Sequence, residues 1–185
     1  MTDTSKAERL LDQVLEALAG DSWVATLDAL EAPAYLTDPQ GNVTYWNRAC
    51  VDFAGREPEL GRDRWCVTWK LFTTVGDPLP HAACPMAIAV KQQRAVRNKV
   101  AIAERPDGTR RAFTPYPTPL FDEAGDLRGA VNLLIDVTAE QGSALTAQAD
   151  RCRRLAKGVN DSRASRVLDD MAIGYERSAV SLQQG

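Results

Sequence analysis

The chain has few of the residues from which catalytic and metal centres are usually built. It holds one histidine, and its four cysteines form no Cys-x-x-Cys pair and no spacing typical of a zinc site. Scattered cysteines of this kind indicate reduced thiols in a cytosol rather than a disulfide framework.

Long apolar runs and one-sided charge are also missing. No segment is apolar over a length that would span a bilayer, and residues 1–5 lack the basic start and apolar core of a signal peptide. We therefore expect a cytoplasmic protein with no membrane insertion. The formal net charge of −3 provides no concentrated basic field, so nucleic acid is not an expected partner.

What the chain does have is helical patterning at both ends. Apolar residues recur at helical spacing over residues 5–19, and a second short helix is predicted before Pro33. From Thr138 the pattern is helical again, and the second of two helices there carries Val167, Leu168, Met171, Tyr175 and Leu182 at helical spacing. We predict an N-terminal helical extension over residues 1–30 and a C-terminal helical hairpin over residues 139–185.

Strand signals fill the middle of the chain. Residues 34–37 and 43–46 are rich in β-branched and aromatic side chains and flank a turn with Pro39 and Gly41. Three further strands are predicted at 96–105, 110–120 and 127–137, with turn residues between them. Two strands, then helices, then three antiparallel strands predict an α+β fold.

The fourth predicted strand carries prolines at alternate positions, Pro115, Pro117 and Pro119. Proline has no backbone N–H, and alternate residues of a strand point their N–H groups to the same side. A ladder on that side of the strand must therefore lose its donors over this stretch, although neighbouring N–H groups can still bond to its carbonyls. We predict a local loss of pairing there.

In their order and spacing, several of these residues resemble the PAS domain family. The resemblance covers about residues 30–138, and the residues that carry it are Asp38, Gly41, Asn47, Gly55, Asp107-Gly108 and Asp136-Val137-Thr138. It implies a five-stranded antiparallel sheet over residues 31–138, with the first strand in its interior and helices over one face. It also implies a sensor, like the single-domain bacterial members, that dimerises through its flanking helices.

Two departures from the family narrow this expectation. Flavin-binding members with a reactive cysteine carry the run Asn-Cys-Arg-Phe-Leu-Gln, whereas the nearest run here is Trp65-Cys66-Val67-Thr68-Trp69. A light-sensing flavin site is therefore not expected. The C-terminal helices contain no histidine, which excludes the phosphoacceptor helix of a histidine kinase.

His81, Cys84 and Met86 lie close together just before and inside a predicted helix. Imidazole, thiolate and thioether all bind haem iron, and the proximal histidine of PAS haem sensors comes from this region. A haem-based gas or redox sensor using His81 or Cys84 is therefore the alternative function. The structural alternative is a histidine that hydrogen-bonds near a helix start and a packed cysteine. A Cys84–His81 nucleophile pair would need an oxyanion motif that the sequence lacks, so no catalytic residue is assigned.

The last predicted strand carries Asn132 on the same face as Leu134, which the resemblance turns toward the ligand pocket. A buried amide needs partners, and these are either a ligand or a tyrosine, a water molecule or the backbone. Trp69 and Tyr116 complete the candidate ligand-binding residues.

The resemblance makes Asp136 and Thr138 the link from the sheet to the outgoing helix, with Arg48, Arg56 or Arg64 as the salt-bridge partner of Asp136. We expect a non-enzymatic signalling protein, a homodimer that contacts a protein partner. A small ligand or a partner would bind between the sheet and residues 65–90. A purely structural dimerisation protein, its pocket filled by Trp65, Trp69 and Phe72, is a further alternative.

Overall fold

The computed structural model describes residues 3–20 and 22–183. Within these residues seven strands form one antiparallel sheet in the order β2-β1-β7-β5-β4-β3, with β6 also paired to β7. The strands are β1 (Ala34–Thr37), β2 (Val43–Trp46), β3 (Lys70–Phe72), β4 (Ala101–Glu104), β5 (Arg110–Pro115), β6 (Thr118–Phe121) and β7 (Leu127–Asp136). The first strand lies inside the sheet, between β2 and β7, as the resemblance implies.

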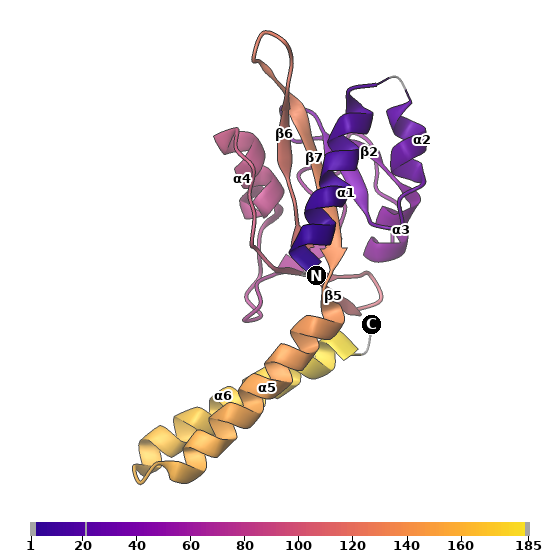
Figure 1. Ribbon diagram of the computed structural model, residues 1–185. Helices are drawn as coiled ribbons and strands as arrows, with labels where there is room; N and C mark the ends of the chain where they lie inside the picture. The colour runs from indigo at the N-terminus through magenta and orange to yellow at the C-terminus, as the bar shows by residue number, and fades with distance from the viewer. Residues whose placement is uncertain (1–2, 21, 184–185) are drawn as a thin grey trace.

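Helices precede, interrupt and follow the sheet. They are α1 (Asp3–Leu18), α2 (Trp23–Asp28), α3 (Arg48–Ala54), α4 (Pro85–Gln92), α5 (Thr138–Gly158) and α6 (Ser162–Gln183), with one 3-10 turn, η1 (His81–Ala83). Figure 1 shows α5 and α6 as a hairpin that extends away from one end of the sheet. Among the helices described, none has the length and apolarity needed to cross a membrane.

The two faces of the sheet are covered by different parts of the chain. On the inner face, Tyr35, Phe113 and Leu134 pack with side chains of α3, α4 and the segment around Trp65. On the outer face, the helices α1 and α2 cover β1 and β7. The root of the α5–α6 hairpin covers Ile102 and Ala112 of β4 and β5 on that same outer face. Both flanking helical segments therefore contact the sheet on the side away from the interior.

The predicted loss of pairing beside the prolines is confirmed. The register against β7 runs unbroken from Pro115↔Leu134 to Thr118↔Val131, and the N–H of Tyr116 donates to the carbonyl of Leu133 at 2.8 Å. The N–H groups of the odd-numbered residues would point to the other side, toward β4, where the ladder ends at Phe113. Beyond it, the N–H of Val96 donates to the carbonyl of Pro117 instead.

Two predicted strands are corrected near the same prolines. The strand expected over 96–105 is only Ala101–Glu104, because the residues opposite its first half include Pro115 and Pro117, which have no N–H. The strand expected over 110–120 is divided at residues 116–117 into β5 and β6, which both pair with β7. A short edge strand, β3, was not predicted. The sheet therefore has seven strands rather than five in the part of the chain described, and its α+β class is as expected.

The C-terminal hairpin packs through small residues. The buried residues of α5 recur at intervals of three and four and are Gly142, Leu145, Ala149, Cys152 and Ala156. Opposite them, Ala172 and Ala179 of α6 are buried. Val167 and Met171, which share the predicted helical spacing of α6, lie outside this contact and are 53% and 44% exposed, because the small residues bring the two helices together.

Gly129 of β7 lies in close contact with the backbone of β1. Its φ is +143°, and a Cβ atom there would lie 1.9 Å from the carbonyl oxygen of Thr37 on β1. Only glycine allows β7 to approach β1 this closely.

We therefore expect Gly129→Ala to lower the free energy of unfolding by about 3 kcal/mol, because β1 and β7 must separate to admit the methyl group. Gly125→Ala is the control, since its φ is also positive at +84° but its Cβ would meet no atom within 4 Å. It should lose only about 1 kcal/mol. Urea unfolding of both variants measures the difference, and equal losses would contradict this account of the sheet.

Candidate functional site

A chain of hydrogen bonds crosses the interior of the molecule, on the inner face of the sheet. The Asn132 amide nitrogen donates to the Tyr35 hydroxyl at 3.0 Å, and that hydroxyl donates to the Trp65 carbonyl at 3.0 Å. The Asn132 amide oxygen accepts the backbone N–H of Tyr116 at 3.0 Å. Asn132 and Tyr35 are 2% and 0% exposed. Of the partners expected for Asn132, the structure supplies a tyrosine and the backbone.

Three buried thiols surround this chain of bonds. Burial raises the pKa of Cys50, Cys66 and Cys84, that of Cys84 to about 12. The Cys66 thiol contacts the Thr68 hydroxyl at 3.2 Å, and the Cys84 sulfur accepts the N–H of Ala87 at the start of α4. Burial, followed by the neighbouring Cys66, raises the pKa of Tyr35 well above its usual value. The thiols are neutral packing groups, so none is suited to act as a nucleophile or a thiolate ligand.

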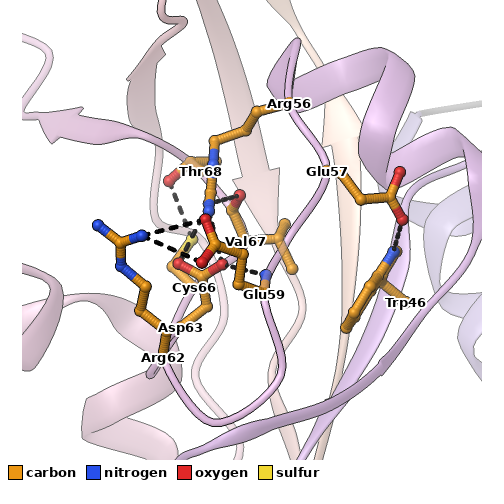
Figure 2. Close-up of polar contacts among 9 residues, drawn as sticks. All are labelled: Trp46, Arg56, Glu57, Glu59, Arg62, Asp63, Cys66, Val67 and Thr68. Carbon is orange, nitrogen blue, oxygen red and sulfur yellow. Dashed lines mark hydrogen bonds and ion pairs between the residues drawn. The ribbon is translucent and has the colours of Figure 1, made fainter.

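Trp65 is buried in the interior cluster, and Arg56 holds the chain segment around it. Figure 2 shows Arg56 with Asp63 and Val67. The Arg56 guanidinium forms two hydrogen bonds to the Asp63 carboxylate, at 2.6 and 3.1 Å, and a third to the Val67 carbonyl at 3.0 Å. The ion pair is largely shielded, with side-chain exposures of 14% and 16%. One arginine therefore binds the chain on both sides of Trp65.

His81 lies outside the interior, in a surface cleft of about 200 Å³. The cleft is lined by Arg56, Glu59, Arg62, Asp63, Thr68, Trp69 and His81. Burial lowers the pKa of His81, and the Asp63 carboxylate only partly opposes this shift. Its Nε2 atom is buried without a hydrogen-bond partner. Two of the lining residues, Arg62 and Glu59, form an ion pair at 3.0 Å (Figure 2).

The predicted ligand-binding residues are divided among three places. Cys84, Met86, Asn132 and Leu134 lie together in the interior, and all four are at most 2% exposed. Trp69 and His81 line the surface cleft. Tyr116 packs on the opposite, outer face of the sheet, in the cluster that α1 covers.

Of the three aromatic residues expected to fill the interior, only Trp65 does so. Trp69 is 49% exposed, and Phe72 packs with the hairpin root on the outer face.

The exit from the sheet is a compact polar joint. The Thr138 hydroxyl accepts the N–H of Ala112 at 3.0 Å and donates to the Asp136 carboxylate at 2.6 Å. The other carboxylate oxygen of Asp136 pairs with Arg111 at 3.2 Å. The joint thus ties the first residue of α5 to both β5 and β7.

Arg111 was not among the expected partners of Asp136. Arg48 pairs with Asp52, Arg56 with Asp63, and Arg64 bonds to the carbonyl of Gln40. Arg111 reaches Asp136 because Asp136 pairs with Phe113, which places Arg111 diagonally opposite on the neighbouring strand.

Asn47 is a structural residue whose importance the sequence only partly indicated. Its side chain caps α3 as expected, accepting the N–H of Cys50 at 3.2 Å. It also accepts the N–H of Ala34 and donates to the carbonyls of Leu27 and Ala32. This fully buried amide therefore fastens α2 and the loop after it to β1, a role that no local sequence signal reveals.

Comparison with known proteins agrees with this architecture. Residues 27–142 match the family model described as the PAS fold. The chain belongs to the PAS family. No significant match was found among curated proteins.

Solved structures similar to this PAS chain share its fold at low identity. One, from a study of a flavin analogue in a light-oxygen-voltage domain, is 16% identical with a TM-score of 0.51, over 72% of this chain and 98% of that one. A Rhodobacter sphaeroides light-oxygen-voltage protein is 14% identical with a TM-score of 0.48, over 96% of each chain. An RNA-binding light-oxygen-voltage receptor is 17% identical with a TM-score of 0.49, over 81% of this chain but only 35% of its own.

The hydroxyl of Tyr35 can be tested directly. Tyr35→Phe removes it and leaves the Asn132 amide and the Trp65 carbonyl short of a partner in the interior. We expect a loss of about 2 kcal/mol in the free energy of unfolding. Tyr45→Phe is the matched control, because its hydroxyl bonds the exposed Asp28 and water can replace it. Urea unfolding compares them, and a loss for Tyr35→Phe no greater than for Tyr45→Phe would argue against the network.

Proposed function

We propose that this PAS protein is a non-enzymatic signalling module. A change on the inner face of its sheet is passed to the α5–α6 hairpin and read by protein contacts. The observation that carries the proposal is the joint at Thr138, which fastens α5 to β5 and β7 through Ala112 and Asp136. The hairpin root also packs on Ile102 and Ala112. A distortion of these strands must therefore move the hairpin.

A haem-based sensor is not favoured by the residues present. Between the sheet and α4, side chains including Trp65, Met86 and Phe113 pack in one cluster. Cys84 has a raised thiol pKa and caps α4, while His81 lies in the surface cleft. Among the described residues no group of three or more His, Cys, Asp or Glu side chains is placed to hold a metal ion.

The coupling through Thr138 makes a measurable prediction. Thr138→Val removes the hydroxyl but keeps the shape, so the N–H of Ala112 loses its acceptor. We expect amide hydrogen exchange in the first turns of α5 to rise about fivefold, since one lost hydrogen bond is worth about 1 kcal/mol.

Thr146→Val is the matched control. Its hydroxyl bonds the Gly142 carbonyl within the same helix, so its loss leaves the joint with the sheet intact. Equal effects of the two substitutions on exchange in α5 would contradict a role for the joint.

We further propose that the hairpin joins two copies of the chain. Its helices contact each other through small residues, which leaves larger apolar side chains exposed on α6: Val167, Met171, Ile173 and Val180. Each is between 44% and 53% exposed. Burying such side chains against a second hairpin would remove this apolar surface from water.

Glutamate at these positions should separate the copies. We expect Ile173→Glu with Val180→Glu to raise the dimer dissociation constant at least a hundredfold, because the dimer would bury four carboxylates. Leu60→Glu with Val75→Glu is the control, since both residues are exposed apolar residues outside the hairpin. Analytical ultracentrifugation measures the dissociation constants. A wild-type chain that stays monomeric at every concentration would exclude this dimer.

A further inference from the structure

Trp65 has a backbone conformation that tryptophan rarely adopts. Its φ is +70°, in the left-handed region, yet the residue is only 7% exposed. A bulky side chain with positive φ is strained and persists only where its surroundings hold it. The backbone of Trp65 is therefore strained, and its indole ring lies at the edge of the interior.

Trp65 and its indole ring are held by hydrogen bonds to the turn at residues 40–41 and by close contact with Gly41. The N–H of Trp65 donates to the Gly41 carbonyl at 2.7 Å, and Arg64 donates to the neighbouring Gln40 carbonyl at 2.8 Å. The ring lies directly on Gly41, where a Cβ would come within 2.1 Å of ring carbon Cζ3. The floor beneath the indole is therefore flat backbone, a surface that any planar ring could use.

Two cations flank the same ring. The guanidinium carbon of Arg64 is 4.7 Å from the ring centroid, and the ammonium of Lys91 is 5.2 Å from it. Cations attract the face of an aromatic ring, and they attract an aromatic ring that bears a negative charge more strongly. Their charges make the place of the indole better suited to an aromatic anion than to tryptophan itself.

We propose that the indole ring of Trp65 can leave its position on Gly41, beside Arg64 and Lys91, and that a planar aromatic carboxylate then binds in that position. The proposal rests on the signalling function above and names the class of ligand. In this proposal the backbone of Trp65 leaves its left-handed conformation when the indole turns outward, and this moves the Trp65 carbonyl, which accepts the hydroxyl of Tyr35. That hydroxyl is bonded to Asn132 on β7, the strand that ends at the hairpin joint.

The test uses indole-3-acetate as the anionic probe and indole as its neutral counterpart. Calorimetric titration should show indole-3-acetate binding to the wild type and binding at least tenfold tighter to Trp65→Gly, which opens the site and suits a positive φ. Trp69→Gly removes a tryptophan four residues away that is 49% exposed, and should bind the probe as the wild type does. Arg64→Gln should weaken indole-3-acetate at least fivefold and weaken neutral indole less, because indole loses only the cation–π contact.

Displacement is measured by NMR on the ¹⁵N-labelled wild type. The probe is unlabelled, so every indole N–H signal observed comes from the protein. The Trp65 signal, assigned by its absence in Trp65→Phe, should shift and exchange faster with water when the probe saturates the protein. No binding to the wild type, or binding that leaves this signal unchanged, would overturn the proposal even if Trp65→Gly failed to fold. The dimer and the Thr138 exchange measurements need no probe, so a failure here is distinct from a failure of the signalling function.

Discussion

The hydroxyl of Tyr35 is held at the centre of the molecule by bonds to two parts of the fold that are distant in sequence. It accepts from Asn132 on β7 and donates to the carbonyl of Trp65. Neither partner can move away without leaving a buried polar group unsatisfied, at a cost of about 1–3 kcal/mol. Because β7 pairs with β1, β5 and β6, the position of this one hydroxyl is linked to most of the sheet.

Features governed by local rules could be predicted from the sequence. The alternate prolines predicted which kind of pairing would be lost, because a missing N–H is a property of the residue and its direction follows from strand geometry. Alternation of side chains placed Asn132 on the same face as Leu134, and the resemblance to the PAS family implied that this face is the inner one. The loss of pairing depended on spacing within one strand, whereas the choice of face for Asn132 also needed the family's topology.

Features that depend on register could not be found this way. The salt bridge between Arg111 and Asp136 requires the alignment of β5 with β7, and the register of the adjoining β6–β7 hairpin shifts between Leu120 and Phe121. Counting back from the turn would therefore miss the true partner by one residue and turn Arg111 to the wrong face. The hairpin posed a similar problem, because helical spacing alone cannot tell whether alanines or larger residues form the contact.

A signalling domain needs two arrangements of comparable free energy, and the strain at Trp65 brings them closer together. A left-handed backbone costs a residue about 1–2 kcal/mol, whereas burial of a tryptophan side chain is worth about 3–5 kcal/mol. The packed arrangement is then favoured by a few kcal/mol, a gap that a ligand can overcome if it binds one arrangement that much more tightly. An unstrained, ideally packed aromatic residue would widen this gap and leave the sheet in a single state. Under the proposed function, the positive φ of Trp65 keeps this gap small enough for a ligand to overcome.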